Sequence, residues 1–91
     1  MRFAVVDVET TGGHPAANGI TEIGIAVVEG DQVVDRFHSL VNPKQNIPLN
    51  IQALTGITPE MVADAPVFDE VANDVLSFLE SSVFVAHNVN F

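Results

Sequence analysis

An amphipathic helical pattern stands between strand-like segments, and this order constrains the fold more than any other feature of the sequence. A helix is predicted to begin at Pro66, after which apolar residues recur at helical spacing: Phe68, Val71, Ala72, Val75, Leu76 and Leu79. Ser81 and Ser82 are expected to end it, and residues 83–87 (VFVAH) to form a strand. Because a helix connects this strand to the earlier ones, we expect it to run parallel to one of them.

Three earlier segments also predict strands. Residues 2–8 (RFAVVDV) form a nearly continuous apolar run, which is typical of a largely buried strand. Residues 20–29 (ITEIGIAVVE) alternate between apolar and polar positions, and residues 32–41 (QVVDRFHSLV) follow them after a Gly30-Asp31 turn signal. The two-residue link predicts that the second and third strands form a hairpin.

The stretch between the third strand and the long helix is predicted to be mostly loop. Residues 43–58 contain one expected helical turn, around residues 50–54. Thr58-Pro59-Glu60 predicts the start of a short helix, because it combines a capping hydroxyl, a proline at the first helical position and an acid in the first turn. The predicted order is β-β-β-α-β, an α/β domain. Its mixed sheet has a three-stranded antiparallel meander, a parallel fourth strand and packing helices.

Composition and charge limit what the chain can do. Its 91 residues make at most one domain, and 47% hydrophobic residues indicate a packed core rather than disorder. No apolar run approaches the roughly 20 residues that span a bilayer, and the absence of cysteine fits a cytoplasmic protein without disulfides or thiolate metal sites. The net charge is −9, with Arg2, Arg36 and Lys44 against twelve acids. Any nucleic-acid role therefore needs metal cations or basic surface from other protein.

Two acids inside the first apolar run are the strongest candidates for a functional site. Asp7 and Glu9 are two residues apart, so a strand places both side chains on one face. One interpretation is a solvated face with ordinary surface acids. The other is a site for Mg²⁺ or Mn²⁺, because adjacent carboxylates repel unless a cation lies between them. Thr10, Thr11 and Gly12 follow, where a phosphate or sugar could approach the backbone, although these residues also suit a plain strand-ending turn.

Three short motifs, taken together, resemble a known family. They are VVDVETTG at residues 5–12, LTGIT at residues 54–58 and VAHNVNF at residues 85–91. Their order and approximate spacing resemble those of the DnaQ-like (DEDD) 3′–5′ exonucleases, which include the proofreading epsilon subunit of DNA polymerase III. Within this family the chain is most similar to the exonuclease region of DinG-type helicases and to that of PolC-type polymerases. The resemblance implies a ribonuclease H-like fold and hydrolysis from a 3′ end in replication proofreading or repair.

The resemblance also implies roles for particular residues. Asp7 and Glu9 would be two of four acidic ligands that hold two divalent metal ions, Mg²⁺ or Mn²⁺, for hydrolysis. The implied substrate contacts are Thr10, Thr11, Gly12, Leu54, Thr55, Gly56, His87, Asn88 and Phe91. Without the family, the LTG triplet is better explained by a core leucine before a helix-ending glycine, and Phe91 by core packing. His14 and His38 match no motif and are interpreted as surface or loop residues.

The resemblance further implies that residues 1–91 are the N-terminal half of such a domain. The family's third acid comes directly after the position of Phe91, and a final motif supplies the fourth acid and a histidine or tyrosine near the reacting water. We therefore expect residues 1–91 alone to be inactive and to self-associate through uncovered apolar surface. The expected substrate is a single-stranded 3′ end of DNA, acted on within a larger polymerase or helicase. Two alternatives stay open: an RNA-directed exonuclease, and a non-catalytic nucleic-acid or protein docking module with the same fold.

Overall fold

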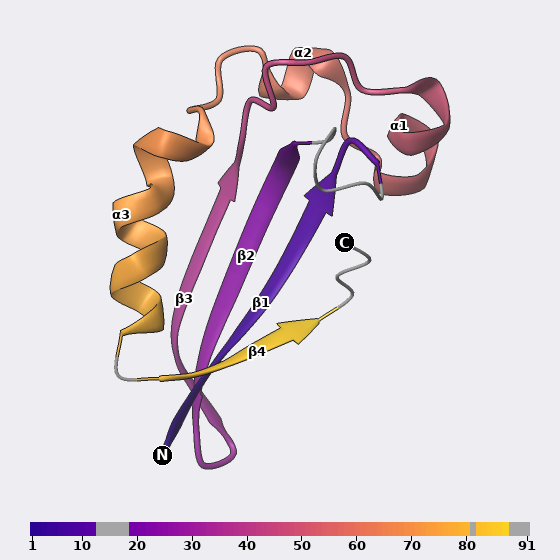
Figure 1. Cartoon of the computed structure of the whole chain (residues 1–91). Coiled ribbons are helices and arrows are strands. Elements are labelled where there is room, and N and C mark those ends of the chain that lie inside the picture. The colour runs from indigo at the N-terminus through magenta and orange to yellow at the C-terminus, as the bar shows by residue number, and fades with distance from the viewer. Residues whose placement is uncertain (13–18, 81, 88–91) are drawn as a thin grey trace.

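The computed structural model describes residues 1–12, 19–80 and 82–87 of the chain. Within these ranges, one sheet is accompanied by a long helix and, beyond one of its ends, by two short helices (Figure 1). The strands are β1 (Arg2–Thr10), β2 (Ile20–Glu29), β3 (Gln32–Leu40) and β4 (Val83–His87). The helices are α1 (Leu49–Thr55), α2 (Pro59–Val62) and α3 (Phe68–Leu79). None of these helices is long and apolar enough to cross a membrane.

The sheet has the strand order β3-β2-β1-β4, which makes β1 a central strand. β2 pairs antiparallel with both β1 and β3, whereas β4 pairs parallel with β1. The predicted meander with a parallel fourth strand is therefore confirmed. β1 runs two residues past its predicted end, to Thr10, and its pairing with β2 becomes irregular between Glu9 and Thr10.

The main core lies between α3 and one face of the sheet. Alternate residues of β1 and β2 point toward the helix, as expected for strands with one buried face. Each of these apolar side chains is at most 8% exposed. The cluster consists of Ala4, Val6, Ile23, Ile25, Val27, Val41, Val71 and Val75.

α3 contacts the sheet with only part of its predicted apolar face. Val71 and Val75 are buried as predicted, but Leu76 is 57% exposed and lies off the packed stripe. Phe78, which was not assigned to the apolar face, packs against the core, and its ring lies 5.3 Å from that of Phe37 in β3. The predicted apolar face included Leu76, whereas the side of α3 that packs against the sheet carries Val71, Val75 and Phe78.

A second, smaller core lies beyond the end of the sheet where β1 and β3 finish (Figure 1). α2 begins as predicted, with the Thr58 hydroxyl accepting a hydrogen bond from the backbone N–H of Met61 at 3.4 Å. α3 begins at Phe68, two residues after the predicted start at Pro66. The connection from β3 to α3 thus has buried side chains of its own: Ile47, Ile57 and Val62.

The sheet face opposite α3 exposes apolar side chains near the start of β1 and along β4. Phe3 is 37% exposed, Val83 44% and Val85 39%. The parallel register pairs Phe3 with Val83 and Val5 with Val85, so these four side chains lie together on this open face. Apolar side chains gathered in this way favour association with another protein surface.

We predict that a protein consisting of residues 1–91 self-associates through this apolar surface at micromolar concentration. Val85→Lys should shift it toward the monomer, because a charge would have to be desolvated in the contact. Leu49→Lys, at an 82% exposed position in α1, is the control and should leave the assembly unchanged. Light scattering coupled to gel filtration measures the mass, and a monodisperse monomer before substitution would contradict the prediction.

Candidate functional site

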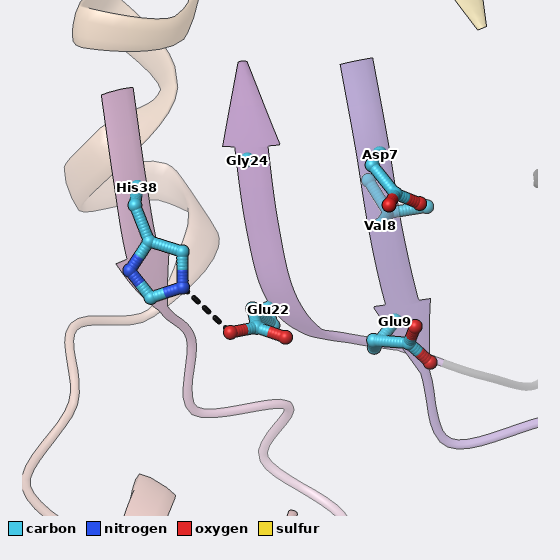
Figure 2. A pocket seen from close by; sticks show the side chains of 6 residues that line it. All are labelled: Asp7, Val8, Glu9, Glu22, Gly24 and His38. Atoms are coloured by element: carbon cyan, nitrogen blue, oxygen red, sulfur yellow. Dashed lines mark hydrogen bonds and ion pairs between the residues drawn. The ribbon is translucent and has the colours of Figure 1, made fainter. Parts of the chain in front are cut away.

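Asp7 and Glu9 lie on the open face of the sheet, toward the end of the central strand β1 (Figure 2). Both line the same hollow, so the two side chains share one face, as their spacing predicted. Asp7 is exposed and Glu9 is partly buried. At Asp7 the strand is paired on both sides, with β2 and β4, and at Glu9 it is paired with β2.

Glu22 of β2 and His38 of β3 share this face with the two acids (Figure 2). Nε2 of His38 lies 2.6 Å from Oε2 of Glu22. Their side chains are 62% and 32% exposed, respectively. The acids and this pair, together with two residues of β1 and β2, line a hollow of about 150 Å³: Asp7, Val8, Glu9, Glu22, Gly24 and His38.

The position of His38 depends on an irregularity in the hairpin. Next to the turn, Val28 pairs with Val33, and a regular ladder continuing from there would pair Gly24 with Phe37. The register instead shifts by one residue between Val27 and Val28, so Gly24 pairs with His38. A one-residue shift exchanges the faces of a strand. Phe37 therefore packs against the core, and His38 reaches the candidate site.

Sequence reasoning missed this role of His38. It was interpreted as a surface or loop residue, and it is exposed, but it lies within β3 and contacts Glu22. The hint in the sequence is its neighbour Phe37, whose large apolar ring favours burial and so turns His38 to the other face. The one-residue register shift itself cannot be predicted from the apolar–polar pattern of the hairpin.

The floor of the site is backbone at Gly24. The register places Gly24 beside Asp7 on one strand and His38 on the other. A Cβ added there would have Asp7 O as its nearest neighbour, at 4.0 Å, so the absence of a side chain leaves the floor open. A further hollow of about 320 Å³ continues from Asp7 past Gly24 and Ala26 to Arg36. The open face therefore forms a shallow trough with acids on one side and Arg36 and His38 on the other.

Burial and negative neighbours raise the pKa of the Glu9 carboxyl above its ordinary value. Desolvation is the largest cause, followed by repulsion from Asp7 and then from Glu22. Ionisation of the Glu9 carboxyl is therefore less favourable in the folded protein than in water. A cation beside this carboxylate would relieve both the desolvation and the repulsion.

We predict that Glu9→Gln stabilises the metal-free fold at neutral pH. Because the folded pKa of Glu9 is raised, its ionisation lowers stability above that pKa, and this cost disappears as the pH falls through the raised pKa and then through the ordinary carboxyl value. The variant should therefore melt at a higher temperature near pH 7 in the presence of a chelator, and the difference should shrink in acid. Thermal unfolding followed by circular dichroism measures both.

Glu29 provides the matched control for this prediction. The pKa of its carboxyl is lowered, first by the hydrogen bond from Arg2 and then by the charge of that guanidinium. Arg2 Nε donates this bond to Glu29 Oε2 at 2.7 Å. Its ionisation therefore favours the fold, and Glu29→Gln should have a small effect of the opposite sign at pH 7. A lower melting temperature for Glu9→Gln at neutral pH would contradict the account of Glu9.

Thr10, the last residue of β1, and Thr11 are engaged in hydrogen bonds within the fold. Thr10 Oγ1 donates to the carbonyl oxygen of Gly12 at 2.6 Å. Thr11 is only 2% exposed, and its hydroxyl donates to Oε1 of Gln45. Of the residues expected to contact substrate here, Thr11 is thus buried, while Thr10 and Gly12 are partly exposed.

Leu54, Thr55 and Gly56 form the end of α1. Gly56 caps the helix in the left-handed conformation, with a φ of 77°, so the helix-ending glycine is confirmed. The expectation of a core leucine is wrong, because Leu54 is 80% exposed. It lies on the outer side of a helix that has no fully buried residue, and so an apolar side chain is available to a ligand. Thr55 is partly buried, and its hydroxyl donates to the carbonyl oxygen of Ile51 at 2.9 Å.

The third motif is only partly within the described residues. The backbone of His87 ends β4 and pairs with Asp7, which brings this motif to the strand that carries the acids. Asn88, Phe91 and His14 lie outside the described ranges.

The donor atoms at the end of β1 suit a hard divalent cation. Asp7 and Glu9 offer carboxylate oxygens, the ligands that Mg²⁺ and Mn²⁺ prefer. Figure 2 shows that the Glu22 carboxylate is turned toward His38. Among the described residues, no group of three or more His, Cys, Asp or Glu is arranged to hold a metal ion. Asp7 and Glu9 are thus the two candidate metal ligands at this end of β1.

Comparison with known proteins finds consistent relatives. Residues 4–91 match the family model RNase_T, described as exonuclease. Over 98% of its length the chain is 48% identical to the 3′-5′ exonuclease DinG of Staphylococcus epidermidis and 44% identical to the PolC-type DNA polymerase III of Thermotoga maritima. Exonuclease X, solved in complex with 5′ overhanging duplex DNA, matches 98% of the chain with a TM-score of 0.80 and 32% identity.

The chain spans only part of each of these proteins. It covers 10% of the DinG sequence, 6% of the PolC-type polymerase and 50% of the Exonuclease X chain. The family match nevertheless includes all but the first three residues, and with them all three motifs. The mixed sheet with its parallel β4 agrees with the fold of the exonuclease structures. The chain belongs to the RNase_T exonuclease family.

Proposed function

We propose that this chain is the N-terminal half of a metal-dependent 3′–5′ exonuclease domain. The observation that carries the proposal is that Asp7 and Glu9 lie together on the open face of a central strand, where burial and negative neighbours raise the pKa of Glu9. A non-catalytic docking module would have no need for two such carboxylates at one hollow. The similarity to a protein named 3′-5′ exonuclease DinG supports the direction of cleavage.

In this proposal, Asp7 and Glu9 hold two Mg²⁺ or Mn²⁺ ions together with two acids from residues beyond Phe91. Such ions lower the pKa of a bound water and stabilise charge on a scissile phosphate. The part of this chain is to hold the two carboxylates in fixed positions from a paired strand, so that little reorganisation is needed on binding.

The remaining motif residues are proposed to receive the 3′-terminal nucleotide. Thr10 and Gly12 come shortly after the acids and are partly exposed, so they are proposed to contact a sugar or phosphate. Leu54 presents an exposed apolar side chain that could contact a base, next to Thr55 and Gly56 at the end of α1. His87, Asn88 and Phe91 of the third motif are proposed to complete the contacts.

The proposed substrate is a single-stranded DNA 3′ end. Similarity to a PolC-type polymerase and to DinG supports a place within a larger DNA-processing protein, in proofreading or repair. The net charge of −9 makes the chain repel a phosphate backbone on its own. Divalent ions, together with the rest of such a protein, would offset this repulsion.

We predict that residues 1–91 alone release little or no mononucleotide, whereas an extended domain does. The extended domain is defined as residues 1–91 with the following part of the same protein, which is proposed to carry the other two acids and the general base. A general base typically contributes about 10²–10⁴ in rate, so the shorter protein should be slower by at least that factor. The assay is the release of 5′-mononucleotides from a 3′-labelled single-stranded oligonucleotide with Mn²⁺.

A comparison of DNA and RNA oligonucleotides in the same assay tests the substrate class. Faster cleavage of RNA would replace the proposed substrate but keep the proposed reaction. Metal-dependent release by residues 1–91 at the rate of the extended domain would show that the half-site suffices, and so would contradict the proposed division of the domain.

A further inference from the structure

A group of hydrogen bonds ties the end of β1 to a loop 34 residues further along the chain. The Thr11 hydroxyl donates to Oε1 of Gln45, which lies in the loop between β3 and α1. The backbone N–H of Gly19 donates to Thr11 Oγ1 and to Gln45 Oε1, at 3.1 Å in each case. The backbone N–H of Thr11 donates to the carbonyl oxygen of Gly19 at 2.9 Å. These bonds join the two ends of the β1–β2 connection to each other and to Gln45.

The chemistry of the donors fixes which end of the Gln45 amide takes part. The backbone N–H of Gly19 can only donate, so the atom of Gln45 that faces it must be the amide oxygen. That oxygen also accepts the hydroxyl proton of Thr11, whose side chain is almost fully buried. Without this oxygen, two donors would lose an acceptor, and for the buried Thr11 no water could easily replace it.

The same loop packs against Gly19. A Cβ at Gly19 would lie 3.2 Å from both the Cβ and the carbonyl oxygen of Pro43, closer than ordinary van der Waals contact. Pro43 stands two residues before Gln45. The loop after β3 therefore supports the β1–β2 connection both by close packing and by hydrogen bonding.

We propose that Gln45 is a positioning residue for the candidate active site. The register of β1 with β2 shifts between Glu9 and Thr10, and the ladder ends at the Thr10–Ile20 pair, so it does not hold the chain beyond Thr10. Two residues after Glu9, the hydrogen bonds of Thr11 to Gln45 and Gly19 hold the chain in position. In this arrangement the Thr11 hydroxyl serves the fold, and the contact with a substrate 3′ end falls to the backbone of Thr10 and Gly12. The inference rests on the proposed function of Asp7 and Glu9.

The test compares variants of Gln45 in the extended domain. Gln45→Met keeps the length of the side chain but removes the acceptor, and Gln45→Glu keeps an acceptor oxygen. Asn46→Ala is the matched control, because Asn46 is exposed and its side chain has no hydrogen-bond partner among the described residues. Two readouts are needed: amide hydrogen exchange at Thr11 and Gly19, and kcat and KM for a single-stranded oligonucleotide with Mn²⁺.

For Gln45→Met we expect amide exchange at Gly19 to become about tenfold faster, because the hydrogen bonds among Thr11, Gly19 and residue 45 would open more often. We also expect kcat to fall about tenfold with a smaller change in KM, because displacement after Glu9 affects the reacting geometry more than binding. Gln45→Glu should restore both values to within about twofold, and Asn46→Ala should leave them unchanged.

Faster exchange with an unchanged kcat would overturn the positioning role and leave a purely structural one. Unchanged exchange at Gly19 would show that Gln45 does not hold Gly19 and Thr11 together by hydrogen bonds. An unmutated extended domain without nuclease activity would instead contradict the proposed function, and the positioning role would fall with it. In that case the exchange data would still decide whether Gln45 holds Thr11 and Gly19 together.

Discussion

Asp7→Asn in the extended domain should lower the rate of mononucleotide release by about 10³-fold or more. The substitution keeps the shape of the side chain but removes the negative charge that would hold a divalent ion. Several kcal/mol of charge stabilisation would be lost with the ion, and each 1.36 kcal/mol corresponds to a tenfold change in rate. The measurement is single-turnover cleavage of a 3′-labelled oligonucleotide in Mn²⁺.

Asp31→Asn is the control for this variant. Asp31 is an exposed acid in the turn between β2 and β3, at the opposite end of the sheet hairpin from the candidate site. It removes the same charge from the protein, so it corrects for the general effect of net charge on binding to nucleic acid. Equal losses in the two variants would show that Asp7 acts only through net charge.

Ile25→Ala should lower the free energy of unfolding by about 3 kcal/mol, the second large effect that we expect. Ile25 is 3% exposed in the middle of β2 and belongs to the core between the sheet and α3. Loss of buried methyl and methylene groups removes their transfer free energy and leaves a cavity. Since domains of this size are stable by about 5–15 kcal/mol, the variant would lose a large part of its stability.

Val33→Ala is the comparison for the core substitution. Val33 lies in β3 and is 45% exposed, so its truncation should cost about 0.5 kcal/mol or less. Urea denaturation followed by circular dichroism gives both values. A similar loss in the two variants would contradict the assignment of the core to the face that carries Ile25.

Local sequence patterns were enough to predict the architecture. The helical spacing before residues 83–87 implied a parallel last strand, and the short Gly30-Asp31 link implied the hairpin. The spacing of Asp7 and Glu9 was also sufficient to place them on one face, because strand side chains alternate regardless of register. Each of these predictions was made from residues that are close together in the chain.

The features that could not be predicted depend on distant contacts. His38 reaches the candidate site because of a one-residue shift in the hairpin, which the apolar pattern does not encode. Leu54 is 80% exposed because no element within residues 1–12, 19–80 and 82–87 covers it, although its apolar character suggested a core position. Gln45 contacts Thr11 across 34 residues of sequence, and nothing in the local pattern links the two.

The central claim is that Asp7 and Glu9 bind a divalent metal ion, and the position of a bound ion tests it most directly. Crystals of the extended domain grown with Mn²⁺ would show the ion by its anomalous scattering. We expect an anomalous peak within coordination distance of carboxylate oxygens of both Asp7 and Glu9, and its disappearance in Asp7→Asn. A well-ordered site with no anomalous peak, or with Mn²⁺ bound away from these two side chains, would contradict it.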